Sequence, residues 1–113
     1  MPYDDALAQR IRTALAGVAG ISEKKMFGGV AFLDRDHMFV GVSGTALMVR
    51  VGKPLYADSL RRRHVREMDF TGKPMQGYVF VDPPGIDSDE QLRFWLRCSR
   101  EFVATLPPKT KKG

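Results

Sequence analysis

The residues best suited to chemistry in this chain form a compact run of basic side chains near its middle. They are Arg61, Arg62, Arg63, His64 and Arg66. Guanidinium groups at this density attract phosphate and carboxylate groups, so nucleic acid, a phosphorylated ligand or an acidic protein face could bind there. The same run also fits the solvated end of a helix, where cations interact favourably with the negative pole of the helix dipole.

A second group of cations lies at the C-terminus, where Lys109, Lys111 and Lys112 follow two prolines. We expect residues 109–113 to form a flexible basic tail. The formal net charge of +5 is therefore partly local. The sequence has no helix-turn-helix, RNA-binding aromatic motif or zinc finger. Any binding of nucleic acid is expected to be weakly sequence-selective and steeply dependent on salt.

Arg50 indicates a third cationic site, on one face of a sheet. It lies between Val49 and Val51 in a predicted strand, so its side chain belongs to the opposite face. The basic residues expected near it are Lys25, Arg66 and Lys73. The aromatic residues expected beside them are Phe27, Phe70 and Tyr78. Such a patch could bind nucleotides or single-stranded nucleic acid by charge and stacking. The alternative is a solvated face on which Arg50 pairs with Glu67 or Asp69.

Residues that could support catalysis are present but are poorly arranged for it. Gly28 and Gly29 lack the later glycine and the Lys-Ser/Thr pair of a phosphate loop. They predict a bulge or a close backbone contact in a strand. Ser43 is followed by Thr45 where the G-x-S-x-G nucleophile elbow needs glycine, so it predicts a turn serine.

The imidazole and thiol groups also lack the spacing of metal ligands. They are His37, His64 and Cys98. Cys98 is expected to be a small, partly buried residue. The acidic residues cluster around turns, where they suit helix capping, and none ends a twelve-residue calcium loop. We predict no catalytic residue, no metal and no cofactor.

The composition indicates one ordinary globular domain. The chain has 113 residues, of which 43% are hydrophobic and 27% charged, so we expect a single domain over residues 1–108. The N-terminus lacks the pattern of a signal peptide, and no apolar run reaches about 18 residues. With one cysteine, these features favour a cytoplasmic protein without a membrane segment.

Helices and strands alternate along the sequence. Apolar residues at steps of three and four predict a first helix, with Asp4 or Asp5 as its cap. Strands are predicted over Lys24–Leu33, His37–Val42, Ala46–Val51, Val65–Phe70 and Gly77–Val81. A short helix is expected from Pro54 to near Arg63, with Leu55, Tyr56, Ser59 and Leu60 on its inner face. The last helix opens with a capping box at Ser88 and Gln91 or at Asp87 and Glu90.

The predicted order is α-β-β-β-α-β-β-α, an α+β fold with one antiparallel sheet. Short polar turns between neighbouring strands favour hairpins. Helices covering one face of the sheet give a two-layer arrangement. The other face, or an edge strand, is then open to a partner, which includes a second copy of the chain in a homodimer.

Blocks of sequence along nearly the whole chain resemble the N-terminal domain of the TfoX/Sxy family. The blocks are Lys25–Phe32, Met38–Val42, Leu47–Gly52, Met68–Met75 and Gly77–Val81. The resemblance implies an α+β two-layer fold like that of secretion chaperones. Full-length TfoX/Sxy proteins regulate natural competence with a cAMP-receptor-type transcription activator, and they carry a second, C-terminal domain. The resemblance supplies no catalytic motif.

Three functions follow as hypotheses. The first is a regulatory or adaptor module that acts through contacts with a protein partner, such as the transcription machinery. The second is a weakly sequence-selective nucleic-acid-binding protein that uses the cations Lys25, Arg50, Arg61, Arg62, Arg63, Arg66 and Lys73. The third is a small-ligand binder or an enzyme of unrecognised type, which would need a concave pocket.

Overall fold

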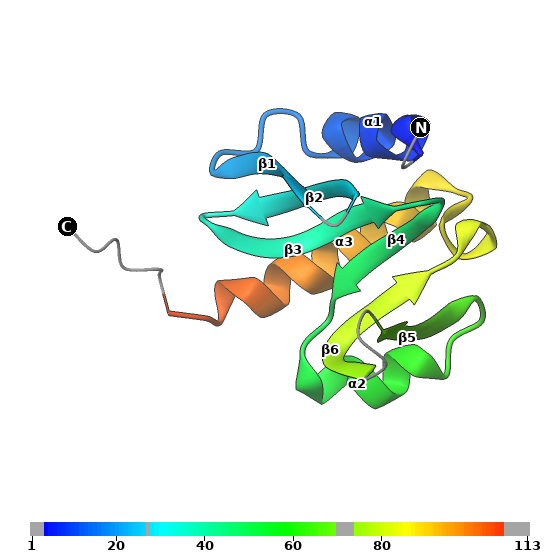
Figure 1. Cartoon of the computed structure of the whole chain (residues 1–113). Helices are drawn as coiled ribbons and strands as arrows, with labels where there is room; N and C mark the ends of the chain where they lie inside the picture. Colours follow the sequence, from blue (N-terminus) through cyan, green and yellow to red (C-terminus); the bar gives the residue numbers. More distant parts are fainter. Residues whose placement is uncertain (1–3, 27, 70–73, 108–113) are drawn as a thin grey trace.

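Within the residues that the structure describes, the sheet contains six antiparallel strands, and three helices pack on it. The computed structural model describes residues 4–26, 28–69 and 74–107. The elements are α1 (Asp5–Ala14), β1 (Ile21–Met26), β2 (Gly29–Asp34), β3 (His37–Ser43), β4 (Ala46–Arg50), α2 (Lys53–Leu60), β5 (Val65–Asp69), β6 (Pro74–Val81), the 3₁₀ turn η1 (Pro83–Ile86) and α3 (Asp89–Ala104). The strand order is β1-β2-β3-β4-β6-β5, so β1 and β5 form the edges (Figure 1).

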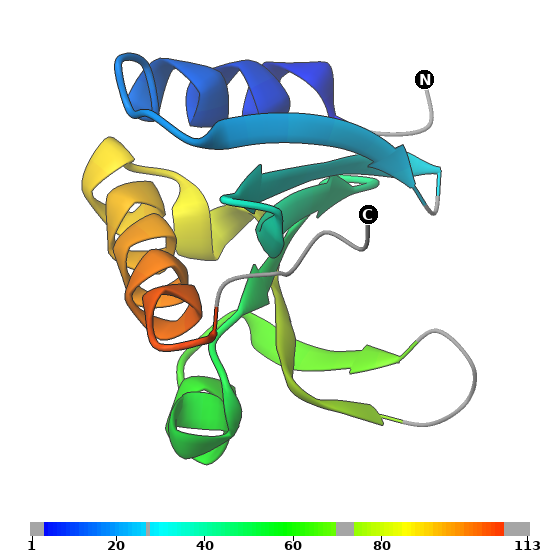
Figure 2. The ribbon, with the colours of Figure 1, turned by 90° about the vertical axis from the view of Figure 1, so that its left-hand side faces the viewer.

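The predicted α+β class and its alternation of helices with groups of antiparallel strands are confirmed. The helices lie on one side of the sheet, and in the described part of the chain no helix covers the other side (Figure 2). None of the helices in these residues is long and apolar enough to cross a membrane.

One predicted strand, Lys24–Leu33, is instead the hairpin of β1 and β2. Gly28 has a φ of +73°, a left-handed conformation that turns the chain back. A Cβ atom on Gly29 would lie only 2.0 Å from the carbonyl oxygen of Val42, so the predicted close backbone contact is confirmed there. The glycine pair thus ends one strand and begins the next, and this adds a sixth strand to the sheet.

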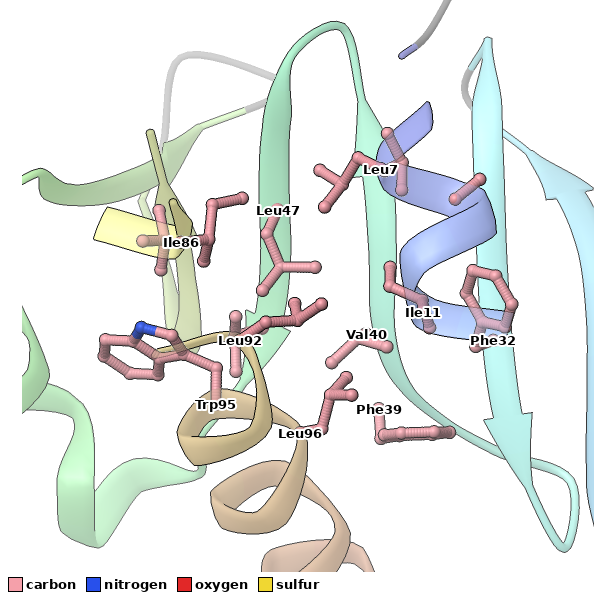
Figure 3. Packing of buried hydrophobic residues seen from close by; sticks show 14 of the residues in the cluster. Leu7, Ile11, Phe32, Phe39, Val40, Leu47, Ile86, Leu92, Trp95 and Leu96 are labelled. Carbon is pink, nitrogen blue, oxygen red and sulfur yellow. The ribbon is translucent and has the colours of Figure 1, made fainter. Parts of the chain in front are cut away.

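The main core lies between the sheet and the helices. Figure 3 shows apolar side chains from both layers meeting there, among them Leu7, Ile11, Phe32, Phe39, Val40, Leu47, Leu92, Trp95 and Leu96. A smaller cluster of buried side chains lies elsewhere on the sheet and consists of Ala46, Met48, Met68 and Phe80. The helices are therefore held by burial of one apolar face each.

The helix starts follow the predicted capping chemistry. Asp4 accepts hydrogen bonds from the backbone N–H groups of residues 6 and 7. Ser88 and Gln91 form the complete capping box of α3, and the alternative pair is not used. The expectation for Leu55 in α2 is wrong, because this side chain is 42% exposed. Leu55 lies about a third of a turn from the middle of the face that carries Tyr56 and Leu60.

The C-terminal end of α3 rests on a glycine at the start of α2. Gly52 has a φ of +83°, and a Cβ atom there would lie 2.4 Å from the ring of Phe102. The N–H groups of Val51 and Gly52 both donate to the carbonyl oxygen of Gly77, at 2.8 and 3.0 Å. This contact joins β4, β6, α2 and α3, so any side chain at Gly52 should disturb all four.

We predict that Gly52→Ala destabilises the fold more than Gly44→Ala. Both glycines have positive φ, but a Cβ atom on Gly44 would meet nothing within 4 Å. Gly44→Ala should therefore lower the free energy of unfolding only through the strain of an alanine at positive φ, by about 1 kcal/mol. Gly52→Ala should cost an additional ~1–3 kcal/mol from overpacking against Phe102. Urea unfolding of both variants measures the difference, and equal losses would contradict the role of the ring contact.

Candidate functional site

The predicted patch around Arg50 does not assemble as expected. Lys25 lies on the edge strand β1, three strands from β4, a separation of roughly 14 Å. It is paired with Val30, whose side chain faces the main core, so alternation places Lys25 on the helix-covered face. The expectation that Lys25 joins Arg50 is therefore wrong. The patch residues that lie outside the described residues are Phe27, Phe70 and Lys73.

Arg50 itself contacts aromatic rings within the fold. Its guanidinium carbon lies 5.6 Å from the ring centroid of Tyr78 and 5.5 Å from that of Phe102. Its Nη1 donates to the carbonyl oxygen of Met38 at 3.3 Å. The alternative ion pair between Arg50 and Glu67 is not formed. Arg50 thus links β3, β4, β6 and α3, and its charge is partly buried by these contacts.

Arg66 is also occupied within the fold. Its Nε lies 3.1 Å from each carboxylate oxygen of Asp82, and its guanidinium stacks 4.8 Å from the ring centroid of Phe80. A further anion would therefore compete with the carboxylate of Asp82 for this guanidinium. Of the predicted cations in the described part of the chain, this leaves the run from Arg61 to Arg63 as the best placed to meet a partner.

The arginine run lines a hollow of about 590 Å³ between the end of α2, η1 and α3. We call it the arginine hollow; its residues are Arg61, Arg62, Arg63, His64, Pro84, Gly85, Glu90, Gln91, Phe94 and Trp95. The basic side chains are all exposed. The predicted placement of cations at the end of a helix is confirmed, since Arg61 follows the last residue of α2.

Arg62 is held in the hollow by two aromatic rings. Its guanidinium carbon lies 4.3 Å from the ring centroid of Phe94 and 5.7 Å from that of Trp95. The two rings meet edge to face at 5.1 Å. Cation–π contacts of this kind are worth about 0.5–1 kcal/mol at exposed sites. Stacking restricts the side chain and leaves the N–H groups at the guanidinium edge available to donate hydrogen bonds to a carboxylate or phosphate.

The turn that carries the arginines is shaped by close backbone packing. His64 has a φ of +68°, which is uncommon for a residue other than glycine. A Cβ atom on Gly85 would lie 3.2 Å from the Cβ of His64 and 2.7 Å from a methyl group of Val81. The N–H of Asp82 donates to the carbonyl oxygen of His64 at 2.8 Å. The glycine therefore lets the arginine turn and η1 approach each other.

Sequence reasoning identified the arginines of this site but missed its aromatic wall. Trp95 lies on the buried face of α3. Phe94 lies outside that face and is only partly buried. An aromatic residue outside the apolar face of an amphipathic helix could have predicted this aromatic wall.

The remaining candidates for chemistry do not converge. Within the described ranges, no group of three or more His, Cys, Asp or Glu residues could hold a metal ion. His37 donates through Nε2 to the carbonyl oxygen of Pro107 at 2.9 Å. Ser43 pairs with Ala46 around the Gly44 turn, as predicted for a turn serine.

Cys98 is partly buried on α3, as predicted, and its acidity depends on the arginine hollow. Burial raises the pKa of the Cys98 thiol, and the carboxylate of Glu101 raises it further. The guanidinium groups of Arg62 and Arg97 lower the pKa by smaller amounts. The thiol is therefore predominantly protonated at neutral pH.

We predict that the pKa of Cys98 follows the charges around it. Arg62→Ala should raise the pKa of the thiol further, because it removes a nearby cation, and Glu101→Gln should lower it. The pH dependence of alkylation by iodoacetamide, followed by mass spectrometry, measures both shifts. Arg35→Ala, which removes an exposed arginine in the β2–β3 turn, serves as the control. A midpoint below the ordinary thiol value of about 8.5 in the wild-type protein would contradict this prediction.

Comparison with known proteins identifies the fold family. A family model of the TfoX N-terminal domain matches residues 13–103, which is well over half of the chain. Searches of curated proteins and of solved structures found no match. The matched residues contain all six strands, α2, most of α3 and the whole arginine hollow. The resemblance noted in the sequence is thus confirmed, and the chain belongs to the TfoX N-terminal domain family.

Proposed function

We propose that this domain is a regulatory or adaptor module that works through protein contacts, with the arginine hollow as the surface that binds an acidic segment of its partner. The observation that supports this best is Arg62 stacked over Phe94 and Trp95 beside Arg61 and Arg63. Arginine and aromatic residues are enriched at the energetic centres of protein interfaces. A preorganised guanidinium also costs less entropy when it binds a carboxylate.

The lining of the hollow favours a peptide over a uniform polyanion. Glu90 and Gln91 line the hollow on the α3 side, together with Phe94 and Trp95. A carboxylate at this position repels a continuous phosphate backbone, whereas a peptide can place a neutral or basic residue beside it. The two aromatic rings accept apolar side chains of the same peptide. Membership in the TfoX N-terminal domain family, which is not known as a family of enzymes, supports the regulatory part of the proposal.

Binding of nucleic acid is the second candidate function, because three consecutive exposed arginines surround the hollow. Arg50 and Arg66 are engaged by aromatic rings and by Asp82, so they add little charge for phosphates. Within the described residues the hollow therefore offers about three strong phosphate contacts, which implies a salt dependence with a slope of only about 2 to 3 on logarithmic axes.

We predict that a labelled acidic peptide of glutamate and leucine, in which prolines prevent a helix, binds this protein more tightly than single-stranded DNA of equal charge. Fluorescence anisotropy at low and high salt measures both affinities. The triple change Arg61→Ala, Arg62→Ala and Arg63→Ala should weaken binding of the peptide by roughly tenfold, because it removes three charges and the stack. Arg35→Ala should leave the affinity unchanged.

Other outcomes of this titration decide between the two candidate functions. Tighter binding of DNA, lost in the triple variant, would favour the nucleic-acid function. Unchanged binding of both probes in the triple variant would exclude the hollow as the binding surface. A partner recovered from cell extract by the wild-type protein, and lost with the triple variant, would support the adaptor function.

A further inference from the structure

A groove between α1 and α3 is another concave surface of the molecule, and it shares no residue with the arginine hollow. It consists of two adjoining hollows, of about 690 and 460 Å³, which share Ala14 and Arg93. Residues at every turn of α3, from Asp89 to Ala104, line its length. At 1.5 Å per residue this gives a groove of about 22 Å. That length matches four turns of a docked helix.

The groove has an apolar floor and a mixed wall on the α1 side. Leu15, Leu92 and Leu96 line it and are only 2–6% exposed, so they lie at its base. The α1 wall consists of the exposed alanines 6 and 14 and of the polar residues Gln9, Arg10 and Thr13. The two alanines leave room for larger apolar side chains of a partner helix.

Two arginines on the α3 wall have no partner within the described part of the chain. Arg93 and Arg97 are exposed, lie one turn apart and make no ion pair or hydrogen bond there. By contrast, Arg10 approaches Asp89 at 3.5 Å, and the next arginine along α3, Arg100, binds the buried Asp34 at 3.1 Å. Like charges one turn apart destabilise a helix slightly. Asp89 and Glu101 lie one turn before Arg93 and one turn after Arg97 and offset this repulsion, but they leave two neighbouring cations in the middle of the groove wall.

We propose that this groove docks an acidic amphipathic helix of a protein partner. Its apolar side chains, spaced at i, i+3 or i+4 and i+7, fill the leucine floor, and its carboxylates face Arg93 and Arg97. Charge complementarity selects this occupant. A second copy of the chain would bring the same unmatched arginines to the interface, where they repel. A nucleic acid would place phosphates near Asp89 and Glu101, which line the groove towards its two ends.

The probe for this proposal is a synthetic helical peptide with leucines at heptad spacing flanked by glutamates. The matched control is the same peptide with lysines in place of the glutamates. We expect the acidic peptide alone to bind in fluorescence anisotropy. Arg93→Glu with Arg97→Glu should weaken its binding by roughly tenfold or more at low salt. Ala14→Trp, which fills the groove where its two halves meet, should also abolish binding.

A second set of measurements separates the groove from the arginine hollow. Both arginines and Ala14 are exposed, so circular dichroism should show that the variants remain folded. Arg61→Glu should leave binding of the helical peptide intact. Equal binding of both peptides, or loss of binding in Arg61→Glu but not in the groove variants, would overturn the proposal. A dimer in sedimentation velocity that Ala14→Trp dissociates would also overturn it, since a second copy would then occupy the groove.

Discussion

The position of α3 on the sheet is the constraint on which both candidate surfaces depend. Its N-terminus is fixed by the capping box of Ser88. In its middle the buried hydroxyl of Ser99 donates towards the carbonyl oxygens of Trp95 and Leu96, at 2.9 and 3.0 Å, so this hydroxyl is not left unpaired in the core. Its C-terminal end is fixed by Phe102 against the bare backbone of Gly52. A small rotation of α3 would change the hollow and the groove together.

The sequence predicted elements well where local chemistry determines them. The capping box of α3 and the turn at Gly44 require only neighbours in the chain, and both were found as expected. For Gly28 and Gly29 the predicted close backbone contact was found at Gly29, but the turn at Gly28 was missed, because glycine suits both a bulge and a turn, and the pairing of Met26 with Gly29 distinguishes them. The neighbours of Arg50 were also beyond local reasoning. Alternation identifies the face of a strand, but the order of strands decides which residues share it.

The same type of contact has different consequences for three arginines of this fold. Arg50, Arg62 and Arg66 each lie over at least one aromatic ring. Arg50 is partly buried and Arg66 is paired with Asp82, so both guanidinium groups already interact with residues of the domain itself. Arg62 remains exposed beside a hollow, and its stack on Phe94 and Trp95 leaves its charge open to a partner. Composition alone could not separate these roles, because they depend on where each ring and carboxylate lies in the fold.

The geometry of α3 also determines how the two surfaces could act together. Successive residues of a helix are rotated by about 100°, so Phe94 in the hollow and Arg93 in the groove project from different flanks of α3. Each surface alone offers exposed charges, which contribute little individually. A single partner that spans the helix would gain from both contacts, since the second contact forms at a high effective concentration once the first is made. Two separate partners, one on each surface, would not raise each other's affinity. A partner that contacts both flanks of α3 should therefore bind more tightly than one that contacts a single flank.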